Sequence, residues 1–183
     1  MTDAELAILT LVAEQPRHGY EIEQVIQERG MREWTDVGFS SIYYLLKKLE
    51  KEDLVAGHLE EAAQGPARRV YHLTPAGRGA LEKALLQALS VPEPRPSRLL
   101  LGIGNLPALP PAEAMSALEQ YGEHLAERLA HVRRRQEEQQ PLPYFVDALF
   151  DYSTALIQAE MAWVEGFREK IRQEQKGGKH VRD

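Results

Sequence analysis

The chain has 183 residues, of which 43% are hydrophobic and 27% are charged, and it contains no cysteine. Such a composition is typical of a globular protein with one large domain or two small ones. The lack of cysteine excludes a disulfide framework, a thiolate zinc site and a cysteine nucleophile. The net charge of −6 argues mildly against a nucleic-acid partner, although binding depends on where the cations lie on the folded surface and not on their sum.

The opening segment lacks the basic residues of a secretory signal, and the longest apolar run, residues 99–106, is too short to span a bilayer. We therefore expect a soluble, cytoplasmic protein with no membrane partner.

Two helices are predicted before residue 30. Thr2 and Glu5 form a capping-box pattern at the start of the first helix, which ends before Pro16. The second runs from about residue 19 to residue 29, and Gly30 is a natural residue to follow its last turn.

A third helix is predicted to begin at Ser40 or Ser41, either of which is a good N-cap. Its apolar residues recur at the spacing of one buried helix face: Ile42, Leu45, Leu46 and Leu49. Because a helix turns about 100° per residue, the opposite face carries hydroxyls, tyrosines and lysines: Ser40, Tyr43, Tyr44, Lys47, Lys48 and Lys51. These side chains are suited to contacting DNA phosphates or base edges.

Two short β-like runs, residues 54–59 and 69–73, are joined by a polar segment broken at Gly65 and Pro66, which predicts a β-hairpin with a long exposed loop. Thr74 then caps a fourth helix, whose apolar residues are Leu81, Leu85 and Leu89. Three helices followed by a hairpin is the order of a winged helix-turn-helix, in which the third helix enters the major groove and the hairpin, the wing, contacts the flanking backbone. The residues predicted to contact DNA are Ser40, Ser41, Tyr43, Tyr44, Lys47, Lys48, Lys51, Arg68 and Arg69.

The polar face of the third helix has an alternative explanation. Glu50 and Glu52 alternate with its lysines, as they would on a solvated helix with internal ion pairs. Two adjacent tyrosines cannot both lie in the apolar stripe, and this favours a binding face. Residues 1–90 nevertheless contain ten Lys and Arg against fourteen Asp and Glu, a net charge of −4, which predicts few phosphate contacts and a modest dependence of affinity on salt.

Three prolines between residues 92 and 96 forbid a helix and predict a stiff connector. We place a winged-helix DNA-binding domain at residues 1–89, a connector with a short apolar helix at 90–111, and a domain of two long helices at 112–183. Its tail from Lys176 is predicted to be disordered.

Both long helices carry apolar residues at heptad spacing, the pattern of a helix packed along another helix. In the first the series are Met115, Gly122 and Leu129, and Leu118, Leu125 and Val132; in the second they are Phe145, Tyr152, Ala159 and Gly166, and Leu149, Leu156 and Trp163. The partner is either the other long helix or a second copy of the chain, and we predict both an intramolecular hairpin and a homodimer. The predicted dimer contacts are Leu118, Leu125, Leu129, Val132, Leu149, Tyr152, Leu156 and Trp163.

Three segments together closely resemble the PadR family of bacterial transcriptional regulators: RHGYEI (17–22), SSIYYLLKKLEKEDLV (40–55) and RRVYHLTPAGR (69–78). The two long helices resemble the larger subfamily. This resemblance implies a homodimeric repressor that binds an inverted-repeat DNA operator and is released by a small aromatic or lipophilic effector. On the family pattern, the DNA-contacting positions are Ser40, Tyr43, Tyr44 and Lys47. Aromatic residues gather in the last third, but they also suit helix packing, so no effector-binding residue is assigned.

An enzyme is not expected, because the chain has no Gly-rich phosphate loop and no GxSxG elbow, and its histidines show no metal-ligand spacing. No cofactor or metal is predicted. The alternative function is a winged helix used only for protein contacts. The predicted fold is mainly α with a small β-hairpin, an N-terminal winged helix-turn-helix followed by a C-terminal long-helix dimerisation domain.

Overall fold

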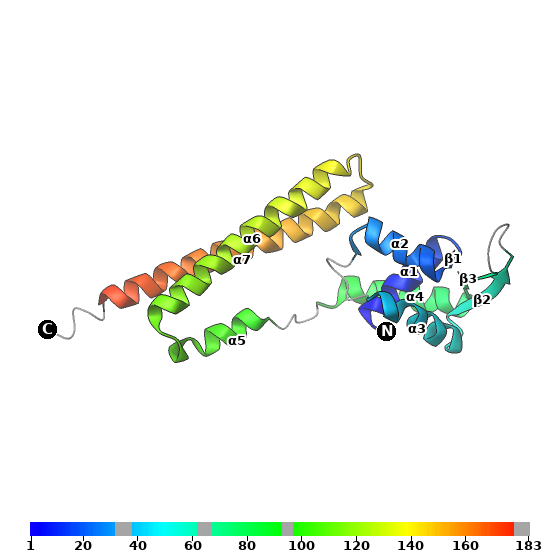
Figure 1. Ribbon diagram of the computed structural model, residues 1–183, viewed down its shortest axis with the longest axis horizontal. Helices are drawn as coiled ribbons and strands as arrows, with labels where there is room; N and C mark the ends of the chain where they lie inside the picture. The colour runs from blue at the N-terminus through cyan, green and yellow to red at the C-terminus, as the bar shows by residue number, and fades with distance from the viewer. Residues whose placement is uncertain (32–37, 62–66, 93–96, 178–183) are drawn as a thin grey trace. The chain divides into compact units, whose positions relative to one another are not determined.

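A computed structural model describes residues 1–31, 38–61, 67–92 and 97–177. It divides the chain into two units, Met1–Pro94 and Arg95–Asp183 (Figure 1). The end of the tail that we predicted to be disordered and most of the predicted wing loop lie outside the described residues.

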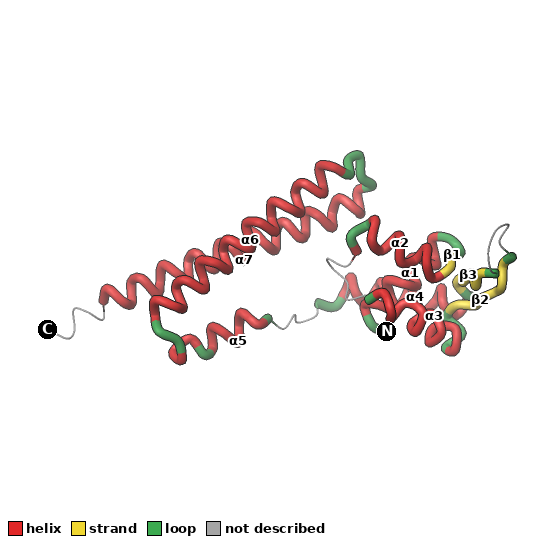
Figure 2. Tube along the Cα trace, viewed as in Figure 1, coloured by secondary structure: helices red, strands yellow, loops and turns green. Residues whose placement is uncertain are grey.

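Within its described residues, the first unit combines four α-helices with one small antiparallel sheet (Figure 2). The helices are α1 (Asp3–Glu14), α2 (Gly19–Glu28), α3 (Phe39–Lys51) and α4 (Pro75–Ser90). The strands are β1 (Arg17–His18), β2 (Val55–Glu60) and β3 (Arg68–Leu73), in the order β1-β3-β2. The predicted hairpin of β2 and β3 is confirmed, whereas β1 was missed because two residues are too short to show any periodicity.

The core of the first unit lies where α1, α2 and α3 meet the sheet. The predicted apolar face of α3 is confirmed, since Ile42, Leu46 and Leu49 are fully buried and Leu45 nearly so. Burying each of these side chains contributes roughly 1.5–3 kcal/mol. This face therefore fixes the rotation of α3, and with it the residues that α3 turns outward.

The N-terminus of α3 differs from the prediction. The helix begins at Phe39, with Gly38 as an N-cap in extended conformation and no side-chain cap. The Ser41 hydroxyl donates instead to the Gly38 carbonyl at 2.6 Å. The predicted N-cap at Ser40 or Ser41 was therefore wrong by two or three residues, because the hydroxyl bonds backward to a carbonyl rather than forward to an N–H.

The fourth helix is anchored at its start and exposed at its end. Thr74 caps it by accepting from the Gly77 N–H at 2.9 Å, and its hydroxyl donates to the Asp53 carbonyl at 2.6 Å. Of the predicted apolar stripe only Leu81 is buried, while Leu85 and Leu89 are exposed. Leu81 alone of the three therefore packs into the core of this unit.

The second unit is built around two long helices that lie side by side (Figure 1). Its elements are α5 (Arg98–Gly104), the short 3-10 helix η2 (Leu106–Ala108), α6 (Pro111–Glu138) and α7 (Tyr144–Gly177). The short elements α5 and η2, which we assigned to the connector, belong to this unit. In the part of the chain that the structure describes, none of the helices combines the length and hydropathy needed to cross a bilayer.

One predicted heptad series of α6 is buried, whereas the predicted series of α7 that includes Leu149 is exposed. In α6, Leu118, Leu125 and Val132 are buried as a heptad series would be. In α7 the buried series is Phe150, Ile157 and Val164, shifted by one residue from the predicted Leu149, Leu156 and Trp163, which are exposed. The helix α7 carries two adjacent apolar stripes, and periodicity does not say which of them meets α6.

Candidate nucleic-acid interface

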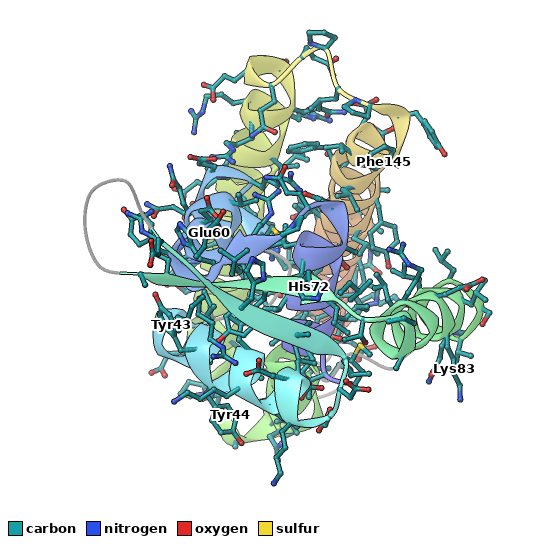
Figure 3. The ribbon with its side chains drawn as sticks, turned by 90° about the vertical axis from the view of Figure 1, so that its right-hand side faces the viewer. Tyr43, Tyr44, Glu60, His72, Lys83 and Phe145 are labelled. Carbon is teal, nitrogen blue, oxygen red and sulfur yellow. The ribbon has the colours of Figure 1, made fainter. Side chains whose placement is uncertain are left out.

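The outward face of α3 displays the two adjacent tyrosines. Tyr43 is 47% exposed and Tyr44 is 68% exposed. Figure 3 shows Tyr43 projecting from α3 towards the strands and Tyr44 projecting away from them. Lys47 and Lys51 are exposed on the same helix and form no ion pair with any described residue. The side chain of Ser40 lies outside the described residues.

Lys48 is held differently from its neighbours. Its ammonium forms an ion pair and hydrogen bond with Glu5, a buried residue of α1, and lies 3.9 Å from Glu52. Burial raises the pKa of Glu5, but the hydrogen bonds from Lys48 and from the Thr2 N–H outweigh it, so the pKa lies below its ordinary value. Lys48 thus links α3 to α1, a structural role that the sequence reasoning missed.

Both arginines at the base of the wing also have partners within the chain. Arg69 donates to Glu50 of α3 at 2.6 Å, and its guanidinium lies 5.9 Å from the centre of the Tyr71 ring. Arg68 Nη1 lies 3.2 Å from His18 Nε2, and Glu60 is the register partner of Arg68 across the hairpin. Each wing arginine therefore has an acidic residue close by, which lowers the positive potential of this surface.

A shallow pocket of about 470 Å³ separates α3 from the wing. Its lining residues come from the start of α2, from α3 and from β3: His18, Gly19, Tyr20, Tyr43, Arg68, Arg69 and Tyr71. Any larger residue at Gly19 would force the Tyr43 ring to move, because a Cβ at this position would lie 2.6 Å from that ring. The pocket brings the predicted Tyr43, Arg68 and Arg69 together in one place.

Tyr20 also lines this pocket, although the sequence analysis did not single it out. It is 63% exposed at the rim of this pocket. Its position relative to Ile22 offered a signal, because two residues correspond to roughly 200° of helix rotation and Ile22 points into the core. His18, in contrast, is the N-cap of α2: its Nδ1 accepts a hydrogen bond from the Glu21 N–H at 3.2 Å.

The predicted dimer contacts fall into two groups. Leu118, Leu125 and Val132 are buried within the chain, and Leu129 packs against the core shared by α6 and α7. Leu149, Tyr152, Leu156 and Trp163 are exposed on α7. Only the second group is open to a second copy of the chain.

The three-helix core and the small sheet define a winged helix-turn-helix domain. Residues 8–83 match the model of the transcriptional regulator PadR-like family. The first unit therefore carries a PadR-like domain.

Individual proteins resemble this chain in sequence or in fold. Uncharacterized protein X of Lysinibacillus sphaericus is 28% identical over 86 residues, which cover 47% of this chain and 78% of that protein. The fold is similar to that of Bacillus subtilis PadR in complex with operator DNA, with a TM-score of 0.76 at 21% identity over 91% of this chain and 98% of that chain. The same relative in complex with p-coumaric acid gives a TM-score of 0.75 at 21% identity, covering 92% and 98% of the two chains.

Proposed function

We propose that this protein is a homodimeric repressor that reads an inverted-repeat operator through α3 and the wing, and that a small aromatic or lipophilic effector releases it. The observation that carries the DNA-reading part is the orientation of α3. Its apolar side chains are buried, and this turns Tyr43, Tyr44, Lys47 and Lys51 outward together. A recognition helix needs such a face, because its side chains must reach base edges and phosphates in the major groove.

The exposed stripe on α7 supports the homodimer. Phe145, Leu149, Tyr152, Leu156 and Trp163 fall within a sector of roughly 60° when the helix is drawn at 100° per residue. A stripe of large apolar side chains along a helix is typical of a surface that another protein covers. Two-fold symmetry would then present two α3 helices to DNA, about 34 Å apart for a dimer that reads successive turns.

The effector part rests on a relative and on one pocket. Bacillus subtilis PadR binds p-coumaric acid, a small aromatic compound. In this chain a pocket of about 160 Å³ lies between α5 and α6, lined by apolar side chains that include Leu99, Ile103, Leu118 and Tyr121. A pocket of this size and apolar lining suits a ligand with one ring.

Two experiments test the proposed reading of DNA. The purified protein is first used to select genomic DNA fragments, and the affinity of Tyr44→Ala for the selected fragments is then measured. We expect one family of inverted-repeat sites to be recovered. Tyr44→Ala should weaken binding to them by about tenfold or more, the loss of one good base or phosphate contact, with the melting temperature nearly unchanged. A large fall in melting temperature would instead assign Tyr44 to the core.

The same experiment decides between DNA and protein as the partner. A winged helix used only for protein contacts remains the second candidate, because acidic side chains lie beside Lys48 and both wing arginines. That module would recover no sequence family in the selection.

The effector part is tested by titrating the fluorescence of Trp163 with p-coumaric acid in a Trp34→Phe background, where no change at any concentration would contradict it.

A further inference from the structure

One carboxylate oxygen joins the recognition helix to both strands of the wing. Glu50 Oε1, on α3, accepts a hydrogen bond from the Gly57 N–H of β2 at 2.9 Å. The same oxygen accepts from Arg69 Nη2 of β3 at 2.6 Å. Hydrogen bonds in which both groups are charged are stronger than neutral ones and more strictly directed. Glu50 thus ties the wing to α3 by hydrogen bonds, beside the buried contacts that Val55 and Tyr71 make in the same core.

The backbone at Gly57 is adapted to this contact. A Cβ on Gly57 would lie 2.6 Å from Arg69 Nε, 2.9 Å from Glu50 Oε1 and 3.1 Å from the Tyr71 ring. Any other residue would therefore push Glu50 or Arg69 out of place. The hydrogen bond from Arg69 holds the pKa of Glu50 below its ordinary value, and the Arg69 pKa is raised in return, so both groups stay charged.

We propose that Glu50 is a positioning residue that fixes the wing on α3 and withholds Arg69 from non-specific phosphate contacts, so that it raises the discrimination between the operator and other DNA. This inference rests on the proposed DNA-binding function. Non-specific affinity grows with the number of free cations facing DNA, whereas specific affinity needs the wing and the helix in a fixed relation. Removing the Glu50 charge should therefore change the two affinities in opposite directions.

The chain offers a matched control for the charge itself. Glu52 follows two residues later, is exposed, and contacts only Lys48, at 3.9 Å, among the described ion pairs. Glu52→Gln removes the same charge near α3 without touching the wing. Glu50→Gln retains an oxygen that can accept from the Gly57 N–H, so the fold should persist while Arg69 loses its charged partner.

The test compares the full-length wild type with Glu50→Gln and Glu52→Gln on two duplexes: the fragment that the wild type selects, and a scrambled duplex of equal length. Both variants should bind the scrambled duplex more tightly than the wild type at low salt. Glu52→Gln should also gain on the selected fragment. Glu50→Gln should lose there, so that its discrimination falls by about tenfold, the equivalent of one charge-assisted hydrogen bond.

Gly57→Ala gives an independent check, because it displaces the same contact without changing any charge. It should lower discrimination because the wing is no longer fixed on α3, and it should tighten the binding of the scrambled duplex less than Glu50→Gln does, because Glu50 keeps its charge. Equal changes in Glu50→Gln and Glu52→Gln, or full discrimination in Gly57→Ala, would overturn the positioning role while leaving DNA binding intact. A wild type that selects no fragment would instead overturn the proposed function from which this inference starts.

Discussion

Gly77 lies in the first turn of α4, directly against the turn that leads from α3 into β2. A Cβ at this position would lie 1.9 Å from the Leu54 carbonyl oxygen, a backbone atom that cannot move aside alone. We predict that Gly77→Ala destabilises the protein by about 1–3 kcal/mol, the usual cost of overpacking. Chemical denaturation followed by circular dichroism measures this change in the free energy of unfolding.

Gly79, two residues further along α4, is the control for the intrinsic effect of alanine. A Cβ there meets nothing within 4 Å. Gly79→Ala should stabilise the protein by up to about 1 kcal/mol, because alanine favours a helix interior over glycine. Destabilisation of similar size at both positions would contradict the steric explanation.

Lys48 and Lys47 are neighbours with opposite expected roles. Lys48→Met should lower the melting temperature at neutral pH, because it leaves the buried Glu5 carboxylate without its cation. The Glu5 pKa is depressed in the folded state, so the stability it contributes is present above the ordinary value of 4.5 and is lost as the pH falls through the folded pKa. The difference from the wild type should therefore shrink below about pH 4.5, as measured by thermal melts at several pH values.

Lys47→Met should show the reverse behaviour. Its side chain is exposed and has no ion pair with a described residue, so the melting temperature should not change. Its affinity for DNA should fall, with a weaker dependence on salt. If Lys47→Met melts lower than Lys48→Met, the structural assignment of the two lysines is wrong.

Among the elements, α6 and α7 are joined by several side-chain hydrogen bonds beside their apolar contact, and one of them involves a tyrosine. The Tyr121 hydroxyl donates to Glu160 at 2.7 Å. Burial and this hydrogen bond raise the pKa of Tyr121 to about 12. The stabilisation is complete below pH 10, the ordinary value for tyrosine, and is lost as the pH rises through about 12.

We predict that one of the seven tyrosines ionises last in an alkaline absorbance titration, and that Tyr121→Phe removes this final step. The substitution should cost about 0.5–1.5 kcal/mol, the net value of one hydrogen bond. Tyr144→Phe is the control, because Tyr144 is exposed at the start of α7. A late step that survives Tyr121→Phe but disappears in Tyr144→Phe would be inconsistent with the contact.

At the scale of the whole molecule, the exposed stripe on α7 predicts the oligomeric state. The wild type should have twice the chain mass by light scattering at micromolar concentration. Leu156→Glu should produce a monomer, because it places a charge in the middle of an apolar interface. The same measurement on Ala162→Glu serves as the control, since Ala162 is exposed on α7 but lies roughly 120° away from Leu156 around the helix. The Ala162→Glu variant should remain a dimer.

Several features of this protein follow from local sequence pattern alone. The capping residues of α1 and α4, the buried face of α3 and the hairpin after it all depend on residues within about two turns or one strand of each other. The order of these elements was enough to predict a winged helix-turn-helix. The outward direction of Tyr44 followed from the same helical period.

Other features depend on contacts between distant residues, and only the tertiary structure decided them. Lys48 meets a residue 43 positions earlier, and Arg69 meets one 19 positions earlier. Both therefore looked like free cations in the sequence, although each is paired. The choice between two apolar stripes on α7 was decided in the same way. A helix period identifies which residues share a face, but only the neighbouring element decides which face is covered, and that contact is absent from any local pattern.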